Sequence, residues 1–120
     1  MNAPRPDEHI RLSDGENKIY YEVDQKIADA GTFRLMKEDH TIGNILRHSL
    51  LRDTRVLFAG YRMPHPLDFS VRIKIKTVSN NDCITVLCDS IDNVTTEYES
   101  IKDQLQRQLN SANAGRDYNI

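Results

Sequence analysis

The chain has no tryptophan, only two cysteines and no long apolar run among its 120 residues. A helix that crosses a membrane needs about 20 consecutive apolar residues, so we expect no membrane span. The first ten residues, MNAPRPDEHI, also lack the apolar segment of a secretory signal peptide. Cys83 and Cys88 would point to different faces of a helix, so a disulfide between them is not expected. These absences predict a soluble intracellular protein with two free thiols.

The sequence also lacks an excess of one charge. Its 16 basic and 18 acidic residues give a net charge of −2. A protein that binds nucleic acid by itself normally carries a concentrated basic face, so the overall charge does not favour that class of function. A length of 120 residues fits one domain, and a domain of this size buries a limited core. A large apolar surface left outside that core would need a partner to cover it.

Glycine and proline are few, five and four, and several of them mark segment boundaries. Residues 1–17 are polar and predicted to be an extended N-terminal segment. Strand-favouring residues predict strands at 18–23, 32–38, 56–63 and 69–77. The last of these strands alternates strictly, with Val71, Ile73 and Ile75 on one face and basic residues on the other. Such alternation indicates a sheet with one buried face and one solvated face.

A first helix is predicted to begin at Asp39-His40-Thr41, with Thr41 as its N-cap. Its apolar face repeats at helical spacing and comprises Ile42, Ile45, Leu46, Ser49 and Leu50. Gly43 lowers the intrinsic helix propensity by about 1 kcal/mol relative to alanine. A glycine in a first turn therefore suggests that another side chain packs closely there.

A second helix, from about Asp82 to Leu109, carries a heptad-like seam. The seam consists of Ile84, Leu87, Ile91, Val94, Tyr98, Ile101, Leu105 and Gln108. The helix would be about 40 Å long at ~1.5 Å per residue, about twice the length of a typical strand. We therefore expect its far half to project beyond the domain and its apolar residues to need a second chain.

The predicted fold is an α+β two-layer domain over residues 18–110, followed by a polar C-terminal tail at 111–120. Its element order is β-β-α-β-β-α, with an antiparallel sheet and the helices on one face. The spacing of the seam leaves alternatives open: it could cover the chain's own sheet throughout, or pair two copies of the chain.

Two motifs, KEDHTIGNILR (37–47) and VLFAGYRMPHPL (56–67), resemble the small alpha-like subunits of archaeal and eukaryotic RNA polymerases. The opening MNAP and the segment LFAGY favour the branch of RNA polymerase II over the branch shared by polymerases I and III. The resemblance implies the dimerisation domain of alpha-type subunits and a nuclear protein without catalytic residues or cofactor. It implies pairing with a larger alpha-like subunit to form the assembly platform for the two large catalytic subunits, the second-largest included. Nucleic acid would be contacted only through the complex.

The resemblance also implies site residues. The helix-start motif at the dimer surface comprises Glu38, Asp39, His40, Thr41, Gly43 and Asn44. The apolar residues Ile42, Ile45 and Leu46 of the same helix are expected to contribute to that surface. The second helix would contribute its seam from Ile84 to Leu105. The strand-and-turn motif comprises Gly60, Tyr61, His65 and Pro66. Ile42 differs conservatively from the leucine usual in the family.

Other functions receive less support from the sequence. A small hydrolase could use Asp39, His40 and His65, but adjacency in sequence does not make a catalytic triad. The four histidines lack the H-x-x-x-H spacing of a common zinc site, so no metal is expected. Arg72, Lys74 and Lys76 lie on one strand face, where a solvated outer surface is favoured over a nucleic-acid contact.

Overall fold

The computed structural model describes residues 10–116 and confirms the predicted fold class and element order. Its elements are β1 (Ile19–Val23), β2 (Ala30–Met36), α1 (His40–Leu51), β3 (Val56–Arg62), β4 (Ser70–Thr77) and α2 (Cys83–Arg116). The MNAP segment and residues 117–120 lie outside the described residues. In the described residues before β1, from Ile10, no helix or strand is present.

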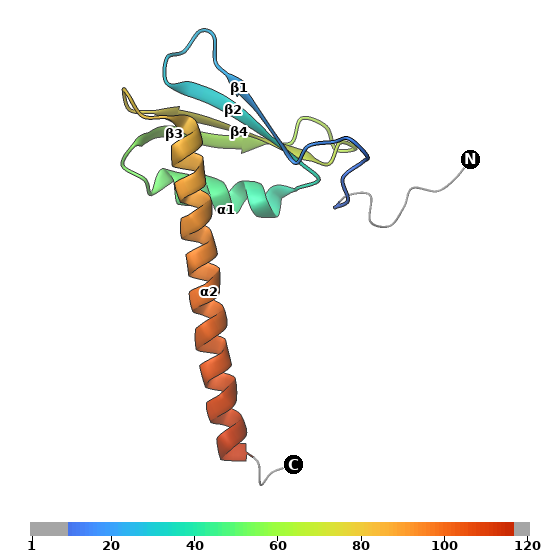
Figure 1. Ribbon diagram of the computed structural model, residues 1–120, viewed down its shortest axis with the longest axis vertical. Helices are drawn as coiled ribbons and strands as arrows, with labels where there is room; N and C mark the ends of the chain where they lie inside the picture. Colours follow the sequence, from blue (N-terminus) through green and yellow to red (C-terminus); the bar gives the residue numbers. More distant parts are fainter. Residues whose placement is uncertain (1–9, 117–120) are drawn as a thin grey trace, which may run out of the picture.

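The four strands form one antiparallel sheet in the order β1-β2-β4-β3. β4 is central and pairs with both β2 and β3, so two strands that are distant in sequence lie side by side. Both helices lie against the same face of this sheet, and α2 then leaves the domain as a long rod (Figure 1). Within residues 10–116, the opposite face of the sheet carries no helix (Figure 1).

The core forms between the sheet and the two helices. Val71, Ile73 and Ile75 of β4 are completely buried, as the alternation predicts. Leu50 of α1 and Val86 of α2 are also completely buried against this strand cluster. Burial of each such side chain stabilises the fold by about 1.5–3 kcal/mol. Strand β4, with three completely buried side chains, therefore lies at the centre of the core.

The N-cap of helix α1 lies two residues earlier than expected, and the prediction of Thr41 as the N-cap is wrong. Asp39 is the N-cap, and its carboxylate accepts a hydrogen bond of 2.9 Å from the Thr41 amide. Its backbone is extended at that position, as an N-cap requires. An aspartate fills this role as well as a threonine and also carries negative charge at the positive end of the helix dipole.

Helix α2 is longer than the sequence indicated, because it continues through the expected polar tail to Arg116. Its 34 residues correspond to about 50 Å. The contact with the core is also rotated from the predicted seam. Cys83, Val86, Leu87 and Ser90 turn toward the sheet, whereas Ile84 is 44% exposed. Ile84 therefore lies outside this core contact, and its predicted place at a subunit interface stays a prediction.

Cys83 is buried and Cys88 is exposed, and both are free thiols. Burial raises the pKa of the Cys83 thiol above its usual range, so this group stays protonated at neutral pH. Among residues 10–116, no helix combines the length and the apolar composition that crossing a membrane requires.

Candidate subunit interface

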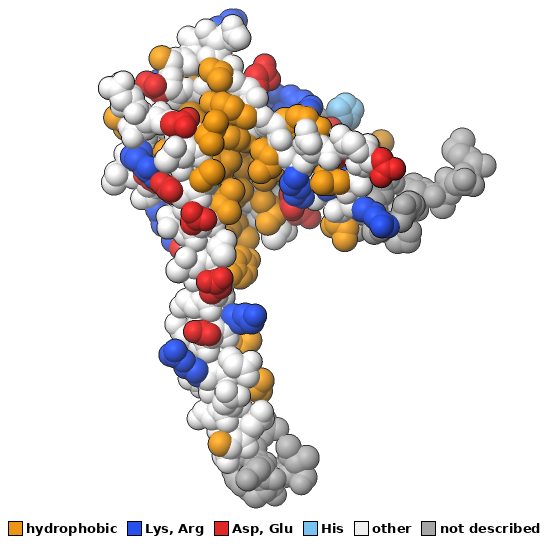
Figure 2. All heavy atoms as spheres, viewed as in Figure 1, with side chains coloured by type: hydrophobic (Ala, Val, Ile, Leu, Met, Phe, Trp, Pro, Cys, Tyr) orange, Lys and Arg blue, Asp and Glu red, His pale blue; other side chains and the backbone are white. Residues whose placement is uncertain are grey.

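An apolar surface runs along the projecting half of α2. We call Tyr98, Ile101, Leu105 and Leu109 the α2 stripe; their exposed fractions are 57%, 62%, 67% and 48%. Figure 2 shows a broad apolar band over the domain beside the first turns of α2, and smaller apolar patches along the projecting rod. The stripe thus extends the apolar surface of the domain into solvent.

The apolar contact between α2 and its own domain ends about one turn before the stripe, and only an exposed ion pair of 3.2 Å between Arg52 and Glu97 is recorded beyond it among the described residues. Ile91 and Val94 are half-buried and pack against the core. Every residue from Thr95 to Asn110 is exposed. Each large apolar side chain left in water forgoes about 1.5 kcal/mol or more relative to burial. This geometry agrees with the expectation that the chain's own sheet does not bury the far half of α2.

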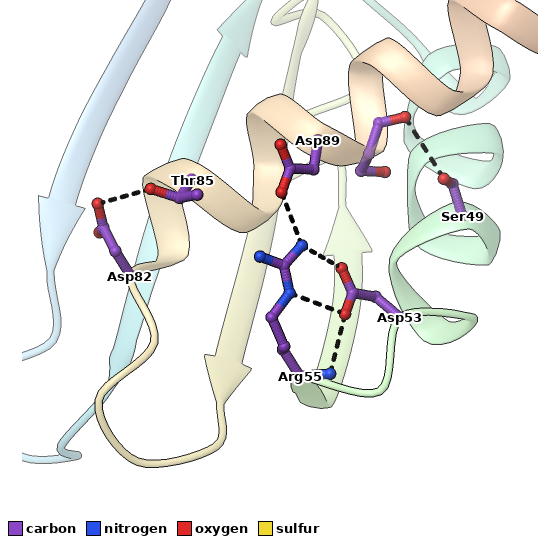
Figure 3. A network of polar contacts seen from close by, with 7 residues as sticks. Ser49, Asp53, Arg55, Asp82, Thr85 and Asp89 are labelled. Atoms are coloured by element: carbon purple, nitrogen blue, oxygen red, sulfur yellow. Dashed lines mark hydrogen bonds and ion pairs between the residues drawn. The ribbon is translucent and has the colours of Figure 1, made fainter.

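A charged cluster fixes the direction in which α2 leaves the domain (Figure 3). Arg55, in the turn between α1 and β3, donates from Nη2 to Asp53 Oδ2 at 2.7 Å and to Asp89 Oδ2 of α2 at 2.8 Å. Its Nε and its backbone amide both donate to Asp53 Oδ1. Ser49 of α1 also donates to the carbonyl of Ser90 at 3.4 Å. These contacts tie α2 to α1 before the helix leaves the core.

The same cluster predicts loss of stability in acid. The hydrogen bonds from Arg55 hold the pKa of Asp53 below its usual range. A carboxyl with a lowered pKa stabilises the fold above its unfolded pKa of about 4 and loses that contribution as pH falls through the folded pKa. We expect Asp53→Asn to lower the free energy of unfolding by about 1 kcal/mol at neutral pH.

Thermal unfolding at neutral pH and near pH 3 measures this effect. The stability of Asp53→Asn should differ from wild type at neutral pH and approach it in acid. Asp103→Asn is the matched control, because Asp103 forms only an exposed pair with Arg107 at 4.0 Å. A constant difference at both pH values would contradict the ionic role of Asp53.

The helix-start motif packs within the chain. His40 Nδ1 lies 3.1 Å from the Tyr61 hydroxyl of β3, and the two rings meet edge to face. Gly43 is buried beneath the Tyr61 ring, whose nearest atom would lie 2.6 Å from an added Cβ. Glu38 accepts a 2.7 Å hydrogen bond from Lys18. The two motifs of the sequence therefore contact each other, and Gly43 allows the close approach of α1 to β3.

The apolar residues predicted for the dimer surface separate into two groups. Leu46 and Leu87 are only 5% and 3% exposed and belong to the chain's own core. Their predicted contact with a partner therefore involves little exposed surface, and it stays a prediction. Ile42 and Ile45 on α1 are half-buried, and with the α2 stripe they remain candidates for contact with another chain.

The strand-and-turn motif lies at and beyond the end of β3. Gly60 is within β3, where an added Cβ would lie 3.0 Å from the Phe58 ring. His65 and Pro66 are exposed in the loop that joins β3 to β4. Only the residues of this motif within β3, Gly60 and Tyr61, have a role in packing, and the part of the motif in an interface stays a prediction.

The residues of the hydrolase hypothesis have structural roles instead. Asp39 caps α1, His40 contacts Tyr61 and His65 lies exposed in a loop. Within the described residues, no three histidine, cysteine or acidic side chains gather as metal ligands would. Asp39, His40 and His65 are therefore not brought together as one site. The exposed apolar residues of the α2 stripe can bind another protein surface.

Comparisons with known proteins agree with this fold, a two-layer α+β domain from which a helix with an apolar stripe projects. The chain belongs to the RNA polymerase Rpb3/Rpb11 dimerisation domain family, which matches residues 30–104. Among curated relatives, DNA-directed RNA polymerase II subunit rpb11 of Dictyostelium discoideum is 40% identical, covering 93% of this chain and 97% of the relative. RNA polymerase II subunit RPB11 of Schizosaccharomyces pombe is 41% identical, covering 90% and 87%.

A solved structure shares the fold at low sequence identity. The crystal structure of DNA-directed RNA polymerase subunit L from Thermoplasma acidophilum superimposes with a TM-score of 0.62 at 19% identity. The match covers 78% of this chain and 92% of subunit L. At that identity the likeness concerns the fold alone.

Proposed function

We propose that this chain is a non-catalytic subunit of nuclear RNA polymerase II. It pairs with the larger alpha-like subunit, and the pair forms the platform on which the two large subunits assemble. The observation that carries this proposal is the α2 stripe, an apolar surface beyond the reach of the chain's own core. The family match and relatives named as polymerase II subunits support the identity of the complex.

The proposed interface has the α2 stripe as its centre, with Ile91 and Val94 at its base. Ile42 and Ile45 of α1 extend it over the domain. The charged flank of the rod, Glu97, Glu99, Lys102 and Asp103, is exposed and forms the rim. An apolar centre with a polar rim is the usual anatomy of a stable protein interface. The stretch from 18 to 110 remains the proposed dimerisation domain, although α2 itself is longer.

The experiment that tests this function is affinity purification of a tagged chain followed by mass spectrometry. We expect the larger alpha-like subunit in equal molar amount, together with the large catalytic subunits of polymerase II. Recovery of the subunits specific to polymerases I and III instead would reassign the complex. Recovery of a second copy of this chain alone would favour a self-contained homodimer.

A further inference from the structure

A row of arginines crosses the sheet face that carries no helix. Arg34 of β2 is the direct cross-strand partner of Arg72 of β4, and Arg72 is the partner of Arg62 of β3. Tyr20 of β1 pairs with Arg34 and completes the row. Cross-strand partners point to the same side of a sheet, and adjacent strands lie about 4.8 Å apart. We call this surface the arginine face.

Among the described residues, no carboxylate is recorded in an ion pair with the three arginines of this face. Like charges directly opposite each other on neighbouring strands destabilise a sheet. The Nε atoms of Arg34 and Arg72 are buried and have no hydrogen-bond partner among the described residues. The Arg34 guanidinium lies 4.5 Å from the centre of the Tyr20 ring, a contact that orients it without neutralising its charge. Three adjacent arginines that form no ion pair within the described part of the chain would be stabilised by an external anionic group.

A hollow of about 500 Å³ lies beside this row. Arg62, Arg72 and Lys74 line it together with Phe58, whose side chain is half exposed. Gly60 lies next to Phe58 in the wall, and its missing side chain helps keep the hollow open. Arginines around an accessible aromatic ring are the composition typical of the energetically important centre of a protein interface.

The acidic groups near the row distinguish between two kinds of anionic partner. Glu22 lines the same hollow, and Asp24 forms an ion pair of 3.5 Å with Lys74. A continuous phosphate backbone would meet these carboxylates as well as the arginines, and the net charge of −2 gives no long-range attraction for it. A protein segment can place its carboxylates over the arginines and other side chains over Glu22. Arginine forms paired hydrogen bonds with such carboxylates.

We propose that the arginine face is a second docking surface, which binds an acidic segment of another protein through Arg34, Arg72 and Arg62. The α2 stripe lies on the opposite side of the sheet, so both surfaces can be occupied at once (Figure 1). If the proposed function holds, the segment belongs to a further polymerase subunit that docks on the preformed pair. The arginine face would bind acidic side chains whether or not the segment belongs to a polymerase subunit.

The test uses the full chain co-expressed with the larger alpha-like subunit, with Arg34→Gln and Arg72→Gln combined. We expect the pair to form in wild-type amount and to melt at or above the wild-type temperature, because the repulsion between arginines is relieved. Recovery of the remaining polymerase subunits should fall about ten-fold or more. Lys76→Gln is the control, since Lys76 lies on the same side of β4 outside the row.

A direct titration accompanies the assembly assay, with a fluorescent glutamate-rich peptide and a single-stranded oligonucleotide of equal net charge as probes. We expect the peptide to bind the wild-type protein and the Lys76→Gln control, and to bind the double variant about ten-fold more weakly. Unchanged subunit recovery together with unchanged peptide binding would overturn the proposal. Arginine-dependent binding of the oligonucleotide but not of the peptide would also overturn it.

The two proposals fail in different ways. Absence of the larger alpha-like subunit from the wild-type preparation would count against the proposed function alone, and the peptide titration on this chain would still decide the arginine face. A fall in melting temperature of the double variant with no change in peptide binding would show that the arginines are structural and would refute docking.

Discussion

Replacement of Ile101 by aspartate is expected to abolish stable pairing with the larger alpha-like subunit. Ile101 lies in the middle of the α2 stripe and is 62% exposed in the single chain. In the proposed pair, a carboxylate there would be buried without a partner, which costs several kcal/mol. We expect an affinity at least about 100-fold lower, and Tyr98→Asp should have a similar effect.

The measurement is the dissociation constant of the pair, or its recovery when both chains are co-expressed. Thr96→Asp is the matched control, because Thr96 is exposed on roughly the opposite side of the same helix. It introduces the same charge into the same helix without entering the stripe. Wild-type pairing by the Tyr98→Asp, Ile101→Asp double variant would refute the interface.

The isolated chain is expected to self-associate as its concentration rises. The four residues of the α2 stripe continue the apolar band of the domain, and nothing in the described part of this chain covers them. Exposed apolar surface of this kind drives non-specific association. Co-expression with the larger alpha-like subunit should restore a single soluble species.

Light scattering coupled to size-exclusion chromatography measures this association. Ile101→Asp should make the isolated chain less prone to associate while preventing heteromeric pairing, whereas Thr96→Asp should leave both properties unchanged. A stable wild-type monomer at high concentration would count strongly against the account. A discrete dimer of this chain would favour self-pairing instead.

Local patterns in the sequence were sufficient to predict the order of the elements. The alternation in β4 predicted its buried and solvated faces, because each residue's side follows from its neighbours. The glycine in the first turn of α1 predicted a close contact, which the structure identifies as the Tyr61 ring. The helix length predicted that α2 would project. These features depend on residues that are near one another in the chain.

Features that depend on distant residues were missed. The ion pair between Arg55 and Asp89 joins residues separated by 34 positions, and no pattern in the sequence indicates it. The basic side of β4 was recognised, but its alignment with Arg34 and Arg62 depends on strand order and register. Heptad spacing also did not show that Cys83 and Val86, which lie outside the predicted seam, are the residues that α2 buries in the core.

Identification of interface residues from the motifs was also limited. The stretch from Glu38 to Gly43 resembles a family motif. That likeness alone does not separate residues that hold α1 to β3 from residues that contact a partner. The contacts of His40 and Gly43 with Tyr61 show that part of the motif maintains the chain's own fold. The exposed stripe of α2 is defined by geometry, so it is the stronger basis for the proposed pairing.

Hydroxyl-radical footprinting of the free chain and of the pair with the larger alpha-like subunit tests the central claim most directly. We expect labelling of Tyr98, Ile101 and Leu105 in the free chain at low concentration and strong protection of all three in the pair. Leu57, which is 62% exposed on the edge strand β3, should be labelled equally in both samples. Equal labelling of the three stripe residues in both samples would show that the partner does not cover α2.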